Sequence, residues 1–205
     1  MDYIESYGDI FRAYDRDYIL CNLYPVMLPI KTAMSFMVKT YETGIEDVEI
    51  IYFVKTDAEP FPVTRHVCEH YSIEPIELER SANDIPYEIH MKHISKIHGI
   101  KEDVLDMYAL TNGDSTYGAG LLVTDTGRQT ICQFFQHDPV YIFPASVHEV
   151  ILIPARCLET ERNRLHFKEH LKGLAIALAD TDKELVLSEH VYRFTPECMT
   201  FRTVL

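Results

Sequence analysis

The sequence lacks the segments that insert proteins into membranes or direct them out of the cell. No apolar run approaches the ~20 residues that a bilayer-spanning helix needs. The opening residues, MDYIESYGD, contain neither the basic nor the apolar stretch of a secretory signal peptide. We therefore expect a soluble protein located in the cytoplasm.

Cysteine, glycine and proline are all scarce, which excludes several further classes of protein. The five cysteines are odd in number, widely spaced and without a Cys-x-x-Cys pair, so we expect reduced thiols and no disulfide framework. The 8 glycines and 10 prolines form no low-complexity run, which argues against long disordered segments. A chain of 205 residues without a linker-like segment is expected to fold as one domain, residues 1–205.

Basic residues are few as well, since 19 Lys and Arg stand against 32 Asp and Glu and give a net charge of −13. Such a charge repels phosphate backbones and anionic lipids, so direct binding to nucleic acid or to a membrane surface is not expected. The partner that it would attract is a basic protein. A sharper version of this interpretation is an acidic mimic of nucleic acid that blocks a basic groove.

Short β-branched and aromatic runs alternate with segments of helical spacing. Strands are expected at 18–24, 34–41, 48–54, 107–111, 140–143, 150–153, 191–194 and 200–204. Helices are expected at 64–71, 75–83, 89–97 and 159–179. The order follows no regular βαβ alternation, so the fold class is α+β, with a mixed, largely antiparallel sheet and several packed helices.

Two segments spell His-x-x-Glu-His, with histidines at His66 and His70 and at His166 and His170. On a helix, residues four apart lie on one face, so each pair has the spacing to hold one metal ion, for which zinc is the natural choice. The alternative is that these histidines sit at the boundary of an apolar helix face for packing alone. No spacing names a third ligand, so a small metal-dependent hydrolase is one of two open interpretations.

Other catalytic and cofactor motifs are missing from the sequence. It contains no dinucleotide fingerprint, no P-loop and no nucleophile elbow, so no cofactor-binding site is expected. Gly118-Ala119-Gly120 is too short to cradle a phosphate by itself. It is typical of a turn or of a close approach between two backbones.

Four segments of the second half carry a family resemblance: 107–112 (MYALTN), 118–119 (GA), 143–152 (FPASVHEVIL) and 187–192 (LSEHVY). These segments resemble DUF5688, a domain-of-unknown-function family of Firmicutes bacteria with no assigned activity. The chain departs from the family where Ala145 replaces a serine and Glu189 replaces an aspartate. The resemblance covers residues 107–205, matches 1–100 poorly, and implies a bacterial, cytoplasmic α+β domain without implying a mechanism.

The resemblance also nominates candidate site residues in two family-like motifs, namely Ser146, His148 and Glu149 in one and His190 and Tyr192 in the other. The functional interpretation is a polar cluster at one end of a sheet, with His148 or His190 as acid or base. The structural interpretation is that these side chains satisfy backbone groups at a turn and a strand junction.

Taken together, the sequence favours a non-catalytic cytoplasmic binding or regulatory module. The metal-dependent hydrolase is the first alternative, and the acidic nucleic-acid mimic is the second.

Overall fold

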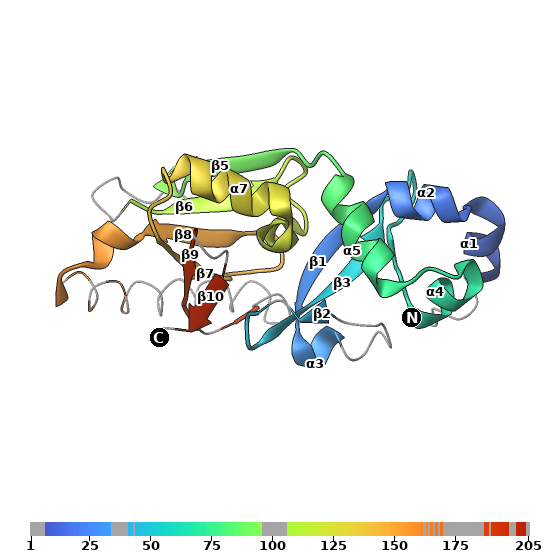
Figure 1. Ribbon diagram of the computed structural model, residues 1–205, viewed down its shortest axis with the longest axis horizontal. Coiled ribbons are helices and arrows are strands. Elements are labelled where there is room, and N and C mark those ends of the chain that lie inside the picture. The colour runs from blue at the N-terminus through green and yellow to red at the C-terminus, as the bar shows by residue number, and fades with distance from the viewer. Residues whose placement is uncertain are drawn as a thin grey trace.

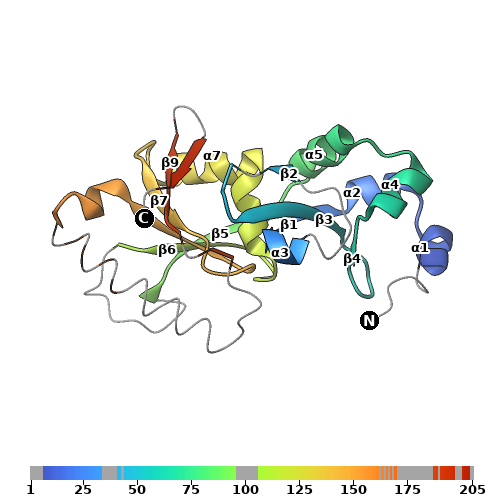
Figure 2. The same cartoon turned by 90° about the horizontal axis from the view of Figure 1, so that it is seen from below.

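The computed structural model describes residues 7–33, 41–42, 44–95, 106–161, 163, 165, 167, 169, 187, 188, 190–196 and 200–203. Its strands form two antiparallel sheets, which we call sheet A and sheet B. Figures 1 and 2 show sheet A with its helices at one end of the long axis and sheet B at the other. The predicted α+β class with antiparallel pairing is confirmed, although the strands divide between two sheets where the sequence suggested one.

Sheet A is built on the strong strand predicted at 48–54, which is β3 (Val48–Val54). β1 (Leu23–Pro29) pairs with one edge of β3, and the short strands β2 (Tyr41–Glu42) and β4 (Phe61–Pro62) pair with the other. Around this sheet lie the helices α1 (Tyr7–Ala13), α2 (Arg16–Cys21), α3 (Ile30–Ala33), α4 (Arg65–Tyr71) and α5 (Pro75–Asp84).

Sheet B follows the order β10-β9-β7-β8-β6-β5. Its strands are β5 (Ile89–His93), β6 (Tyr108–Asn112), β7 (Val140–Phe143), β8 (Val150–Pro154), β9 (Tyr192–Thr195) and β10 (Thr200–Thr203). The 3₁₀ helix η2 (Gly118–Val123) and the helix α7 (Asp125–Phe134) follow β6, and the short 3₁₀ helix η3 (Ala155–Leu158) follows β8. Strands form at the expected positions 140–143, 150–153, 191–194 and 200–204, and they pair as β7 with β8 and β9 with β10.

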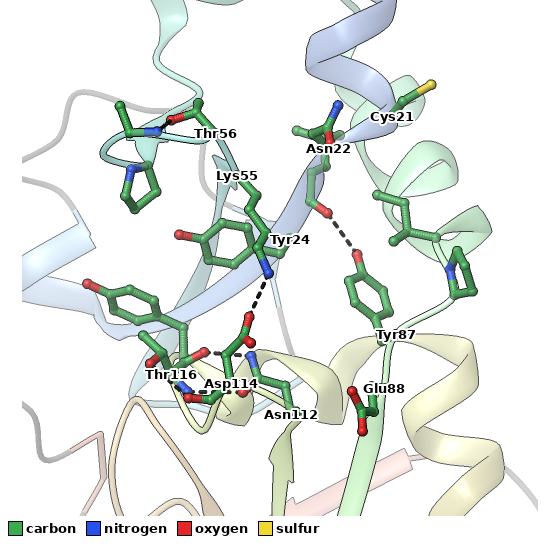
Figure 3. Close-up of a pocket in the computed structure, with 17 residues that line it drawn as sticks. Cys21, Asn22, Tyr24, Lys55, Thr56, Tyr87, Glu88, Asn112, Asp114 and Thr116 are labelled. Carbon is green, nitrogen blue, oxygen red and sulfur yellow. Dashed lines mark hydrogen bonds and ion pairs between the residues drawn. The ribbon is translucent and has the colours of Figure 1, made fainter.

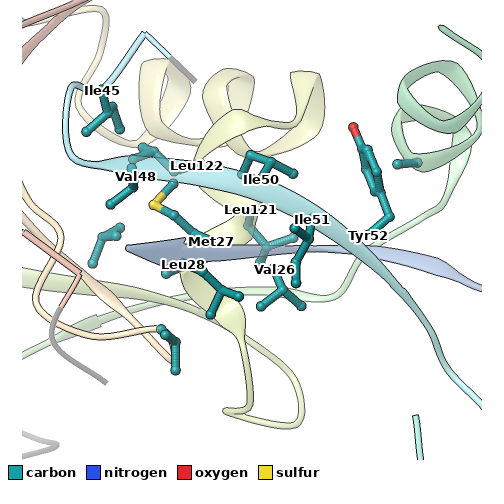
Figure 4. Close-up of a cluster of buried hydrophobic side chains, with 14 of the residues drawn as sticks. Val26, Met27, Leu28, Ile45, Val48, Ile50, Ile51, Tyr52, Leu121 and Leu122 are labelled. Carbon is teal, nitrogen blue, oxygen red and sulfur yellow. The ribbon is translucent and has the colours of Figure 1, made fainter. Parts of the chain in front are cut away.

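One continuous apolar core joins the two sheets. Val26 and Met27 of β1 and Ile51 of β3 belong to the same buried cluster as Leu121 and Leu122 of η2 (Figure 4). That cluster continues into sheet B through Val140, Ile142 and Leu152. η2 is therefore the wedge through which the two sheets share one interior.

Gly120 allows this wedge to approach β1 closely. A Cβ atom built at Gly120 would lie 1.9 Å from the backbone oxygen of Pro25. Since only glycine leaves that space empty, the prediction of a close backbone approach at 118–120 is confirmed.

The segment 18–24 was predicted as a strand ended by Pro25, and this was wrong. Asp15 accepts a hydrogen bond from the backbone N–H of Tyr18 at 2.8 Å, and this N-cap starts α2. The strand begins only at Leu23 and includes Pro25. Proline is tolerated there because β1 is an edge strand of the described sheet and its missing N–H costs no ladder bond.

The helix predicted at 89–97 was also wrong, because Ile89–His93 forms β5 and pairs with β6. A helix of that length is marginal by itself, whereas the open edge of β6 offers partners for the backbone. The helices expected at 64–71 and 75–83 do form: Thr64 caps α4, and α5 buries Leu78 and Ala82. The helix expected at 159–179 lies largely outside the described residues, and Phe167 within that range is fully buried.

Within the described ranges, no helix combines the length and the apolar character needed to cross a membrane.

Candidate functional site

A cavity of about 570 Å³ opens where the strand ends of the two sheets meet. Its lining comes from segments 21–24, 55–60, 85–88 and 112–117, which are the start of β1, the end of β3, the approach to β5 and the loop after β6 (Figure 3). Both sheets thus contribute walls. Cavities of this size are typical of sites for small molecules or single side chains.

Tyrosine rings form much of the wall. Tyr24 on β1 and Tyr117 before η2 lie with ring centroids 6.1 Å apart, and Phe53 packs 5.9 Å from each of them. On the opposite side, the hydroxyl of Tyr87 donates a hydrogen bond of 3.2 Å to the backbone oxygen of Leu23. Burial raises the pKa of Tyr24 and Tyr87 above the ordinary value, so both hydroxyls stay neutral at physiological pH.

A single ion pair spans the cavity between the two sheets. The ammonium of Lys55, just after β3, lies 2.6 Å from a carboxylate oxygen of Asp114 in the loop after β6 (Figure 3). The hydrogen bond from Lys55 lowers the pKa of Asp114, which is therefore ionised at neutral pH. Both side chains are about two-thirds exposed, so solvent screens the pair and it is easily displaced.

A second carboxylate, that of Glu88, lines the cavity and is 74% exposed. One of its oxygens lies 2.9 Å from Nε2 of His90 on β5. A Cβ atom at Gly113 would lie only 2.5 Å from the other oxygen, so the carboxylate rests directly over this glycine. Nδ1 of His90 is buried without a partner, which favours the tautomer whose proton is on Nε2 and is donated to Glu88.

His148, one of the sequence candidates, positions the tyrosine wall. Its Nδ1 accepts the backbone N–H of Tyr117 at 3.1 Å, and Thr111 donates to its backbone oxygen at 2.9 Å. Tyr117 has a φ of +57°, a left-handed conformation that costs a non-glycine residue about 1 kcal/mol or more. His148 therefore helps to hold Tyr117 in an unfavourable conformation in which its ring faces the cavity.

Ser146 has a local role in the turn between β7 and β8. Its Oγ accepts the backbone N–H groups of His148 at 3.2 Å and Glu149 at 3.3 Å. Hydroxyl groups commonly satisfy a tight turn in this way. The geometry at Ser146 matches the structural interpretation of the family-like motif.

His190 and Tyr192 belong to a separate polar network at the start of β9. Asp47, next to β3, accepts hydrogen bonds from the hydroxyl of Ser188 at 2.8 Å and from Nδ1 of His190. The buried hydroxyl of Tyr192 lies 3.2 Å from Ser188 Oγ. Desolvation opposes the ionised form of Asp47, but the hydrogen bonds from His190 and Ser188 outweigh it and lower the pKa of this carboxyl group.

The two family-like motifs do lie at the same end of sheet B. Ile142 near the end of β7 pairs with Tyr192 at the start of β9, and Val150 at the start of β8 pairs with Leu110 of β6. β7 leads into the first motif and pairs directly with β9, whose start carries the end of the second motif. Ser146 bonds within its own turn and His148 bonds to Tyr117, whereas His190 bonds to Asp47 and the hydroxyl of Tyr192 lies next to Ser188.

His66 and His70 pack against α1. The ring of His70 stacks on Phe11 with centroids 3.8 Å apart. His66 makes a T-shaped contact with Tyr7 and a tilted contact with Phe11. In the described ranges, no three His, Cys, Asp or Glu side chains are placed to hold a metal ion. His166 and His170 lie outside the described residues, so a site shared by both pairs remains a sequence prediction.

Comparison of the sequence with models of known protein families gives one match. A family model described as a family of unknown function, DUF5688, matches residues 31–195. The chain belongs to this family. The DUF5688 region starts well upstream of the segments that carry the resemblance in the sequence, and it includes three of the four cavity walls. No curated protein and no solved structure matches the chain.

Sequence reasoning missed most of the cavity residues. Tyr24, Lys55, Tyr87, Glu88 and Tyr117 carry no motif, and they come together only because strand ends of two sheets meet. The only local signal was the turn composition of residues 112–116, which predicts a loop and says nothing of a binding wall.

Proposed function

We propose that the protein is a non-catalytic binding module that takes its ligand in the cavity between the two sheets. The observation that carries this proposal is the composition of the wall. Apolar and tyrosine surface surrounds a few charged and amide groups, which is the usual make-up of a site that orients a ligand.

The absence of a nucleophile–base pair in the lining supports a role without chemistry. Cys21 is the thiol of the cavity wall, and the described lining contains no histidine to act as its base. His148 and His90 are nearby, but their described contacts hold Tyr117 and Glu88 in place. These contacts position cavity groups, which favours binding over acid–base catalysis.

The environment that we propose is the bacterial cytoplasm. The thiols of Cys21, Cys68, Cys132 and Cys157 form no disulfide, which fits a reducing compartment. The net charge of −13 adds a long-range attraction for basic partners. Both features fit the expectation of a binding or regulatory module.

A pair of matched tryptophan variants tests the proposal. Ala58 is an exposed residue of the cavity wall, and Ala13 is an exposed residue at the end of α1, outside the lining. Fragments that bind the wild-type protein in a ligand-observed NMR screen should be lost in Ala58→Trp and kept in Ala13→Trp. A screen whose hits bind both variants equally would show that the cavity is not the binding site.

A further inference from the structure

We infer that the ligand of this cavity is a cation, an ammonium group carried on an aliphatic stem. This inference rests on the proposed function, because it names the ligand class for the same cavity. Two kinds of molecule carry such a group: a partner protein with an accessible lysine side chain, and a free alkyl amine.

The charges of the lining are the first observation. Two carboxylates, Glu88 and Asp114, line the cavity with a single ammonium, that of Lys55. The hydrogen bond from Lys55 lowers the pKa of Asp114, and the carboxylate of Glu88, which is 74% exposed, lies 2.9 Å from Nε2 of His90 and over Gly113. One carboxylate therefore stays uncompensated by a lysine or arginine of the lining. An incoming ammonium would supply that missing charge.

The second observation is that the protein already places an ammonium in this space. Lys55 extends across the cavity, with its charged end at Asp114 (Figure 3). The space is thus compatible with a lysine-like group, including its stem. Because Lys55 and Asp114 are 69% and 67% exposed, a ligand ammonium can displace Lys55 from Asp114 at small cost.

The tyrosine wall is the third observation. The rings of Tyr24, Tyr117 and Tyr87 line the same cavity. The faces of such rings attract cations, and their carbon surface also packs against the methylene stem of an alkyl amine. An anionic ligand would gain neither the attraction of the rings nor that of the carboxylates.

The test compares two cationic probes with one anionic probe. They are pentylammonium, the blocked peptide acetyl-Gly-Lys-Gly-amide, and pentanoate as the anionic counterpart. Each is titrated into the full-length protein and followed by ¹H–¹⁵N NMR. We expect both cationic probes to shift the signals of residues 55–58, 87–88 and 112–117, with a dissociation constant on the order of 1 mM, and pentanoate to leave them unchanged.

Charge variants then report which group binds the probe. Glu88→Gln should weaken pentylammonium binding about fivefold, and the exposed α1 variant Asp9→Asn, which removes an equal charge outside the cavity, should leave it unchanged. Lys55→Met should strengthen binding about two- to fivefold, because it removes the internal competitor for Asp114.

A peptide that binds at least tenfold tighter than pentylammonium identifies a protein lysine as the source, and equal affinities identify a free amine.

Two results would overturn the inference of a cationic ligand. Pentanoate binding that Lys55→Met abolishes and Ala58→Trp blocks would overturn the cationic ligand and leave the cavity as the binding site. Failure of both cationic probes to shift the cavity signals would overturn the inference as well. The fragment screen with the tryptophan variants then decides the proposed function separately.

Discussion

The contact between Gly120 and β1 offers the sharpest test of how the two sheets are joined. Replacing Gly120 with alanine adds one methyl group at the point where η2 meets the backbone of β1. That methyl would lie 1.9 Å from the oxygen and 2.6 Å from the carbon of the Pro25 carbonyl. A carbonyl in a paired strand cannot rotate away as a flexible side chain can, so the two backbones themselves must separate.

The size of the effect follows from this separation. Real Cβ atoms essentially never approach other atoms closer than 3.0 Å, so η2 and β1 must move apart by about 1 Å. The shift would also loosen Leu121 and Leu122, which fill the core between the sheets. Overpacking of this kind costs up to about 3 kcal/mol, and we expect a loss near that figure in the free energy of unfolding. For a chain of this size, such a loss lowers Tm by about 6–12 °C.

Thermal and urea unfolding followed by circular dichroism measure this loss. The matched control is Gly8→Ala in α1, where an added Cβ meets nothing within 4 Å and alanine is the better helix former. We expect Gly8→Ala to be at least as stable as the wild type. A Tm for Gly120→Ala within about 2 °C of that control would refute the argument that η2 wedges the two sheets into one core.

Three further predictions concern single side chains. Asp47→Asn should lower the free energy of unfolding by about 1 kcal/mol at pH 7, after allowance for the partial exposure of Asp47. Because folding lowers the pKa of Asp47, its contribution is present above the unfolded pKa of about 3.9 and is lost as pH falls through the folded pKa. Urea titrations should therefore show the variant less stable than the wild type at pH 7 and equally stable at pH 2. His148→Ala should release the backbone of Tyr117 and cost about 1 kcal/mol, with amide signals of 112–118 shifting in NMR; an unchanged loop would contradict the positioning role. Exposed Cys21 should react with a thiol reagent in the native protein, whereas buried Cys132 should react only on unfolding, as peptide mapping of the labelled protein would show.

Part of the fold could be read from local sequence. β3, β7 and β8 agree with the predicted strands to within a residue, because β-branched and aromatic runs between turn residues leave few alternatives to a buried strand. Thr64 and Pro75 start α4 and α5 as predicted, since helix caps act over a few neighbouring residues.

The segment that forms β5 shows where local sequence does not predict the secondary structure. Its residues suit either a short helix or a strand, and the pairing edge of β6 decides between them. The helix α7 and the wedge η2 were missed for a related reason. The glycines at 118–120 marked a close backbone approach, but the surface that they approach, β1, is almost a hundred residues away in the chain.

Only a few supporting residues of the candidate site could be predicted from the sequence. His148, His190 and Tyr192 were nominated by family resemblance, and the structure places them in contacts that support Tyr117 and Asp47. The cavity itself gathers side chains from four separated segments, none of which carries a recognisable pattern.

The sequence by itself therefore determined the α+β class, the strongest strands, the acidic charge and the family, because these depend on composition and on neighbours along the chain. The tertiary structure alone decided the division into two sheets, the wedge at Gly120 and the cavity between the strand ends. Those features arise from contacts between segments far apart in sequence, where the shape of one backbone determines which side chain the other can accept. The charge of −13 belongs to the sequence, but only the fold brings Glu88 and Asp114 into one cavity with the tyrosine wall.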